Sequence, residues 1–157
     1  DIQSIIVAGP GFAKNDFLKF LQDNYNDLSK KSIIESTGSG GRVGIQEVLK
    51  KGTVEKLTTE NRVAFEMKDI NNLLKLLSKN SELVVYGLNQ TKNAINMGAV
   101  KKLLILDIYM KDDNIEKLMD LTENMGGEVT IISNEHDGGK QLEALGGMAA
   151  ILRYPIS

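Results

Sequence analysis

The chain has 157 residues, of which 41% are hydrophobic and 25% charged, with 19 Lys and Arg against 21 Asp and Glu; this profile predicts an ordinary globular protein of one normal domain or two small ones. It contains no Cys and a single His, His136, which excludes disulfides, thiolate zinc sites, cysteine nucleophiles and two-histidine metal sites, and fits a reducing cytoplasm. The formal net charge of −2 argues against strong sequence-independent binding of nucleic acid, and no apolar run approaches the roughly 18–20 residues of a membrane span.

The first third of the chain has the pattern of two strands that alternate with two helices. In chain order we predict a strand at Ile2–Val7, a helix at Lys14–Tyr25, a strand at Ser32–Glu35, a flexible Gly-rich loop at residues 36–41 and a short helix that ends at Gly52. The first strand opens the chain without a leader, so we expect a piece of a longer protein.

The middle of the chain is the least patterned part. Residues 53–66 are polar and contain neither Gly nor Pro, and we expect a domain boundary there. Asp69 follows this stretch and is predicted to cap a new helix. That helix carries apolar residues at i, i+3, i+4 and i+7: Ile70, Leu73, Leu74 and Leu77.

The rest of the chain alternates strands and helices regularly. We predict strands at Leu83–Tyr86, Leu103–Leu106, Val129–Ser133 and Ala149–Tyr154, and helices at Asn89–Met97, Asp112–Met125 and Gln141–Leu145. Because each connecting helix must cover a sheet face, this alternation predicts an α/β fold with helices on both faces of one sheet.

Two Gly-rich segments lie where phosphates can bind, between a strand and a helix. Neither Gly9-Pro10-Gly11 nor residues 36–44 has the three spaced glycines or the Gly-Lys-Ser/Thr ending of a nucleotide site, so plain helix-entry loops are favoured over a nucleotide pocket. Arg42 follows Gly40-Gly41, so the segment is not the Gly-Gly-Gln tripeptide that hydrolyses peptidyl-tRNA.

Three further positions carry polar groups with chemical potential. Asp107 follows a strand and is a weak candidate metal ligand, although a strand end beside a helix cap at Asp112 is favoured. His136 lies in a loop beside two acids and is predicted to be structural. The turn Gly87–Lys92 places Gly87, Asn89, Gln90 and Lys92 where they could contact RNA, against the alternative of an Asn89 helix cap. We identify no catalytic residue.

Several segments resemble the Pelota family, which is related to the class-one release factors of archaea and eukaryotes. The opening Ile6–Phe12 is similar to the Pro-Gly-Phe motif of the central domain, and Tyr86–Val100 and Leu103–Asp107 are similar to the start of the C-terminal domain. The most specific match is residues 133–155, and the resemblance covers essentially the whole chain.

The resemblance implies a partial RNase H-like central domain followed by an α/β/α sandwich like that of ribosomal proteins that bind kink-turn RNA. It assigns residues 1–57 to the end of the central domain, 58–68 to a linker and 69–157 to the C-terminal domain. It also implies that Pro10, Gly11 and Phe12 dock a GTPase. In the turn, Gln90 replaces the Glu of the kink-turn binders and Leu88 replaces a small or polar residue, which favours a protein-binding role for this domain.

The function that the resemblance implies is ribosome rescue by binding, in no-go decay. The implied partners are the ribosome with its RNA, an elongation-factor-like GTPase (elongation factor 1-alpha in archaea) and a recycling ATPase, in the cytoplasm and without a membrane. The alternatives are a kink-turn RNA-binding protein and the metal-dependent mRNA endonuclease credited to some members; a divalent cation would be the cofactor only in that last case.

Overall fold

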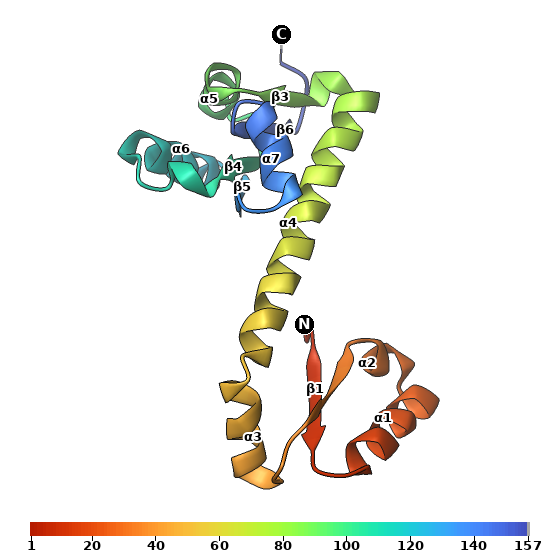
Figure 1. Cartoon of the computed structure of the whole chain (residues 1–157). Coiled ribbons are helices and arrows are strands. Elements are labelled where there is room, and N and C mark those ends of the chain that lie inside the picture. Colours follow the sequence, from red (N-terminus) through yellow and green to blue (C-terminus); the bar gives the residue numbers. More distant parts are fainter. Residues whose placement is uncertain (157) are drawn as a thin grey trace. The chain divides into compact units, whose positions relative to one another are not determined.

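A computed structural model of the chain describes residues 1–156, and the chain divides into two compact units, Asp1–Arg62 and Val63–Ser157 (Figure 1). The division falls inside one long helix, α4 (Thr53–Lys79). Each unit has its own sheet, of two strands in the first and four in the second. In the part of the chain that the structure describes, no helix is both long and apolar enough to cross a membrane.

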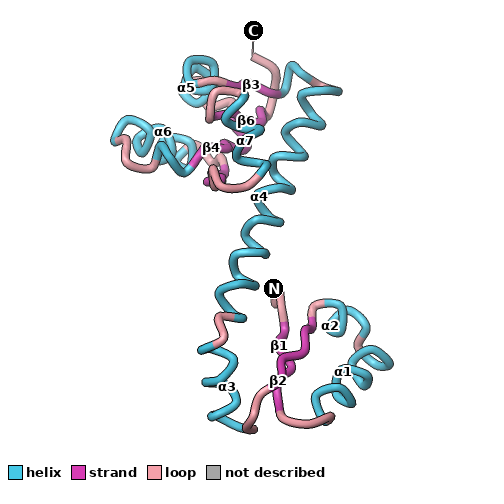
Figure 2. The backbone as a smooth tube through the Cα atoms, in the orientation of Figure 1, coloured by secondary structure: helices cyan, strands magenta, loops and turns pink. Residues whose placement is uncertain are grey.

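The first unit confirms the predicted order of strands and helices. Its elements up to the long helix are β1 (Ile5–Gly9), α1 (Ala13–Asn24), α2 (Asn26–Lys30), β2 (Ser32–Ser36) and α3 (Gly41–Lys50). Strands β1 and β2 lie side by side (Figure 2), and they pair in parallel with Gly9 opposite Ser36. The short helix α2, which the sequence pattern did not predict, begins directly after Tyr25.

The long helix α4 corrects the expected cap at Asp69. This residue lies in the interior of the helix and is only 4% exposed, so it cannot be an N-cap. The expected linker at 58–68 is likewise helical, because the polar stretch contains no Gly or Pro that would end a helix. The predicted stripe is confirmed, since Ile70 and Leu73 are buried and Leu74 and Leu77 are partly buried and pack against the same core cluster.

The second unit contains a four-stranded mixed sheet in the order β3-β6-β4-β5. Strand β6 is antiparallel to both β3 and β4, whereas β4 and β5 are parallel. The elements after α4 are η1 (Ser81–Leu83), β3 (Val84–Tyr86), α5 (Leu88–Asn96), β4 (Val100–Leu106), η2 (Asp107–Tyr109), α6 (Asp113–Asn124), β5 (Glu128–Ile132), α7 (Asp137–Ala144) and β6 (Met148–Leu152).

Both faces of this sheet are covered by helices, which confirms the predicted α/β class. Leu103 and Ile105 of β4 pack into one core cluster with residues of α5 and α6. Leu104 and Leu106 point to the other face and pack with residues of α4 and α7. All four side chains are fully buried, as expected for a central strand that is apolar on both faces.

The helix starts in the second unit agree with the predictions at one position and differ at two. Asp112 caps α6, as predicted, by accepting a 2.9 Å hydrogen bond from the Asn114 amide. The expected Asn89 cap is wrong, because Gly87 occupies the N-cap position with φ 80°. Helix α7 begins at Asp137, ahead of the segment from Gln141 that was predicted to lie in a helix, because the imidazole of His136 caps it.

Candidate functional site

The Pro10-Gly11-Phe12 turn places an aromatic ring in solvent. Gly11 has φ 65°, which only glycine adopts readily, and it reverses the chain directly after β1. Phe12 is the N-cap of α1, and its carbonyl accepts hydrogen bonds from the amides of Asn15 and Asp16 at 3.0 and 3.1 Å. The side chain is 83% exposed, so Phe12 is not a core residue. The backbone is thus fixed while the ring is free to contact a partner.

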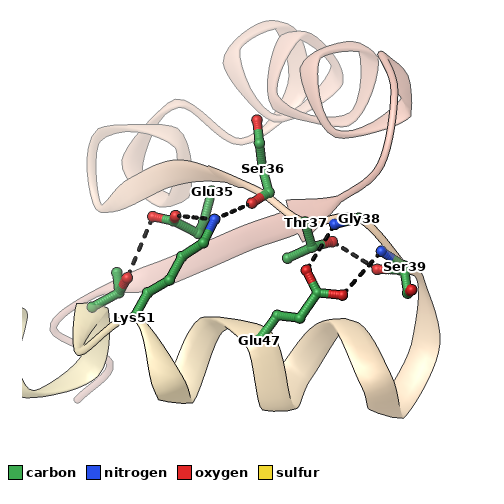
Figure 3. Close-up of polar contacts among 8 residues, drawn as sticks. Glu35, Ser36, Thr37, Gly38, Ser39, Glu47 and Lys51 are labelled. Atoms are coloured by element: carbon green, nitrogen blue, oxygen red, sulfur yellow. Dashed lines mark hydrogen bonds and ion pairs between the residues drawn. The ribbon is translucent and has the colours of Figure 1, made fainter.

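A carboxylate holds the Gly-rich loop that follows β2 (Figure 3). Glu47 of α3 accepts hydrogen bonds from the backbone amides of Gly38 and Ser39 at 2.7 and 3.1 Å. The Thr37 hydroxyl donates to the Ser39 carbonyl at 2.7 Å. A Cβ atom on Gly44 would lie 2.4 Å from the Ser39 carbonyl oxygen, so the loop packs closely against α3. This loop is therefore ordered, although the sequence pattern predicted a flexible one.

The two Gly-rich segments meet at one edge of the first unit. Because β1 and β2 are parallel, the turn after β1 and the loop after β2 emerge at the same edge of their sheet. A 3.3 Å hydrogen bond from the Thr37 amide to the Gly9 carbonyl joins them. We call residues 10–12 and 37–41 the first-unit edge. It combines an exposed aromatic ring with a fixed backbone loop, which suits a protein contact better than a reaction.

The turn Gly87–Lys92 lies at the carboxyl end of β3. Gly87 accepts the 3.1 Å hydrogen bond from the Thr91 amide that starts α5. The side chains of Asn89, Gln90 and Lys92 are exposed. The structure thus places the predicted RNA-contacting groups in solvent on the first turns of one helix.

Asp107 does not fit the metal centre that the endonuclease alternative requires. One of its carboxylate oxygens accepts a 3.1 Å hydrogen bond from the Asn134 amide. Asp107 is also the first residue of the short helix η2, which follows β4. Within residues 1–156, no group of three or more His, Asp or Glu side chains converges as metal ligands would.

Sequence reasoning missed a buried polar cluster around Glu66 of α4. Glu66 is 3% exposed, and its carboxylate accepts a 2.6 Å hydrogen bond from the Ser133 amide. Its second oxygen lies 3.6 Å from Nε2 of His136. Nδ1 of His136 accepts from the Gly138 amide at 3.1 Å, which assigns the ring proton of a neutral imidazole to Nε2, facing Glu66. His136 is therefore structural, as predicted, but its acidic neighbour comes from another element.

A second missed cluster surrounds Asp69. Its two carboxylate oxygens accept hydrogen bonds from Lys102 Nζ at 3.1 Å and from the Thr130 hydroxyl at 2.9 Å, and Lys102 also lies 3.2 Å from Glu128. Burial by itself lowers the pKa of Lys102, but the hydrogen bonds and charges of Asp69 and Glu128 outweigh it, so the pKa is raised above its ordinary value. The sequence spacing could have revealed both clusters, because Glu66 and Asp69 continue the apolar stripe of α4 toward its N-terminus and are therefore expected on its buried face.

Comparison with known proteins places both units in one family. The sequence profile of eRF1 domain 2 matches residues 1–60, and that of eRF1 domain 3 matches residues 63–156. The protein pelota homolog of Methanobrevibacter smithii is 62% identical over 157 residues, which are all of this chain and 44% of that protein. The homolog of Methanothermobacter thermautotrophicus is 51% identical over 156 residues, and again 44% of it is covered. The chain thus spans less than half the length of these relatives.

Solved structures agree with the sequence matches. A model of ribosome-bound archaeal Pelota and ABCE1 has a TM-score of 0.82 and 45% identity over 99% of this chain and 44% of that one. Archaeoglobus fulgidus Pelota has a TM-score of 0.75 and 39% identity over the whole chain and 50% of its own. Saccharomyces cerevisiae Dom34, a translation termination-like factor that interacts with Hbs1, has a TM-score of 0.64 and 27% identity over 99% of this chain and 48% of its own. The chain belongs to the Pelota family, and its two units correspond to eRF1 domains 2 and 3.

Proposed function

We propose that the chain acts in ribosome rescue, as part of a factor that binds stalled ribosomes and promotes separation of their subunits. The support is its identity of 62% to a pelota homolog and the fold that it shares with Pelota bound to the ribosome and ABCE1. The proposed setting is no-go decay in the cytoplasm. The proposed partners are the ribosome, a recycling ATPase and an elongation-factor-like GTPase, elongation factor 1-alpha in an archaeon.

The observation that carries the GTPase contact is the exposure of Phe12. Its ring is 83% exposed at a turn whose backbone is fixed by Pro10 and by the first turn of α1. Because this backbone is already ordered, docking costs little further backbone entropy, and aromatic residues are enriched in interface cores as energetic anchors. The first-unit edge therefore acts as the docking surface, with Phe12 as its central contact.

Substitution of Phe12 tests this contact. We expect Phe12→Ala to weaken binding of the GTPase to this chain by about fivefold or more, equivalent to about 1 kcal/mol, because an anchor is removed. Binding is measured by isothermal titration calorimetry with the GTP-bound GTPase. The matched control is Phe65→Ala, which removes a ring that is 57% exposed in the other unit. Equal affinity of Phe12→Ala and the unaltered chain would remove the assignment.

The kink-turn alternative is favoured by one observation, the exposure of Asn89, Gln90 and Lys92. Contacts of Lys92 with RNA phosphates would make binding of a kink-turn RNA fall steeply with salt. Docking through Phe12 would depend only weakly on salt, because its contribution is apolar. A salt titration of each complex therefore distinguishes the two functions.

A further inference from the structure

A groove of about 400 Å³ in the second unit has four lysines among the nine residues that line it. It lies between the second half of α4 and the start of β4. Its donors are four ammonium groups and two carboxamides, from Lys75, Lys79, Lys101, Lys102, Asn72 and Asn80. We call it the lysine groove; the chain as a whole has a net charge of −2, so this wall is unusually cationic.

The carboxylates of the protein do not neutralise the positive charge of the lysine groove. Its one carboxylate, Asp69, is 4% exposed and is already paired with Lys102 and Thr130. No carboxylate in residues 1–156 lies within 4.0 Å of the ammonium groups of Lys75, Lys79 or Lys101. Three cations therefore remain available to a ligand.

A β-bulge brings two consecutive lysines to the same groove. The pairing of β4 with β6 shifts register between Val100 and Lys102, so Lys101 is an extra residue in its strand. In a regular strand, Lys101 and Lys102 would point to opposite faces of the sheet. The bulge breaks this alternation, and both side chains line the groove. Bulges are common beside functional sites, where they re-aim a side chain.

The lysine groove lies at the other edge of the sheet from the turn Gly87–Lys92. Strands β3 and β4 are both antiparallel to β6 and therefore parallel to each other. Gly87 and Asp107 follow their carboxyl ends and share one edge, whereas Lys101 and Lys102 lie near the amino end of β4. The groove is thus separate from both residue sets that the sequence predicted in this unit.

The chemistry of the groove suits phosphate. We propose that the lysine groove binds the phosphate backbone of RNA. Lysine ammonium groups bind phosphate as point charges, without the fixed planar geometry that the forked guanidinium of Arg imposes on carboxylate and phosphate alike, and the lining has four of them and no Arg. Lys75 and Lys79 are one turn apart on α4, about 6 Å along its axis, and so present a row of charges rather than one closed pocket.

The contact is with the backbone and not with the bases. No aromatic side chain lines the groove on which a base could stack, so binding there is independent of sequence. This proposal goes beyond the rescue function and does not depend on it, because free RNA is sufficient to test it.

The experiment measures binding of a fluorescein-labelled single-stranded RNA of mixed sequence, about 20 nucleotides long, by anisotropy between about 50 and about 200 mM KCl. The whole 157-residue chain is used. The groove variant combines Lys75→Gln, Lys79→Gln and Lys101→Gln. The control combines Lys111→Gln, Lys117→Gln and Lys140→Gln, which are exposed lysines of the same unit and remove the same charge. Circular dichroism verifies that both variants fold.

We expect the groove variant to bind RNA about tenfold or more weakly at the lowest salt, and its slope of log K against log salt to be smaller by about 2, since each phosphate contact on a single strand contributes about 0.7. The control retains the slope of the unaltered chain. Equal losses in the two variants, or no RNA binding by the unaltered chain at about 50 mM KCl, would overturn the proposal.

Two further arms separate the alternatives. A variant with Asn89→Ala and Lys92→Gln is expected to retain the RNA slope; if it loses that slope while the groove variant keeps it, the RNA site is the turn and not the groove. A polyglutamate peptide is expected to compete poorly with RNA. If it binds more tightly than RNA and only the groove variant loses it, the groove binds an acidic protein segment and the proposal is wrong.

Discussion

At the scale of single residues, the buried negative charge of Asp69 is compensated by the ammonium group of Lys102. The carboxylate is buried, and its two described donors come from neighbouring strands, Lys102 on β4 and Thr130 on β5. Removal of one partner leaves a buried charge incompletely compensated, which costs more than loss of an exposed ion pair. The pair therefore fixes the position of α4 over the sheet within the second unit.

We expect Lys102→Met to lower the free energy of unfolding of the second unit by about 2 kcal/mol, measured by urea denaturation at neutral pH. Lys111→Met, which removes an exposed lysine, is the control and should change stability by less than about 0.5 kcal/mol. A loss as small as that of the control would mean that solvent compensates Asp69.

The pH dependence of this effect follows from the raised pKa of Lys102. A group whose pKa is higher in the folded state stabilises the protein fully below its unfolded pKa, about 10.4 for Lys, and loses this contribution as pH rises through the folded value. The stability difference between the unaltered chain and Lys102→Met should thus be constant from about pH 7 to about pH 9 and shrink above about pH 10.4. Denaturation series at these pH values measure it, and a difference that shrinks already below about pH 9 would contradict the assignment.

At the scale of elements, the order of the loop after β2 depends on Glu47. Its carboxylate accepts from two loop amides, and a carboxamide in its place has one acceptor oxygen and no charge. We expect Glu47→Gln to speed hydrogen exchange of the Gly38 and Ser39 amides by about tenfold, since hydrogen bonds to a charged group contribute about 1.5–3 kcal/mol. The exchange is read by NMR, with the exposed Glu55→Gln as control. Unchanged exchange at both amides would show that the packing of Gly44 alone orders the loop.

The elements that the sequence predicted are those with a strong local pattern. Strand β4 is apolar on both faces, and Asp112 marks a helix start by its own conformational preference, so each was located within a few residues. The start of α4 was not located, because its polar first half carries no amphipathic signal and Asp69 resembles a cap. What Asp69 does is decided by Thr130, which lies 61 residues later in the chain.

Among the candidate sites too, those made of consecutive residues were predictable from the sequence, and those that join distant residues were not. The Pro10–Phe12 turn was recognisable because its residues are consecutive. The lysine groove was not, because it joins α4 to β4 across the fold and depends on a bulge that no residue in the sequence marks. The meeting of this turn with the Gly-rich loop likewise follows from the parallel pairing of β1 and β2, which periodicity does not specify.

At the scale of the whole molecule, the two units differ in how much apolar surface they bury. Among residues 1–156, the buried hydrophobic side chains of the first unit are Val7, Leu21 and Val48, whereas the second unit buries 19. Of these 19, 15 are Val, Leu, Ile or Met, and each such side chain contributes about 1.5–3 kcal/mol of transfer free energy, so the second unit has by far the larger hydrophobic term. Two hydrogen-bonded strands also protect fewer amides than four.

We therefore expect the first unit to open independently of the second and more often. Hydrogen exchange followed by mass spectrometry should find the amides of β1 and β2 exchanging at least about a hundredfold faster than those of β4 and β6, a difference in local opening free energy of about 2.7 kcal/mol or more. The comparison is internal to one sample of the whole chain, so pH and temperature cancel. Equal protection in both sheets would mean that the first unit draws its stability from contacts other than its own core.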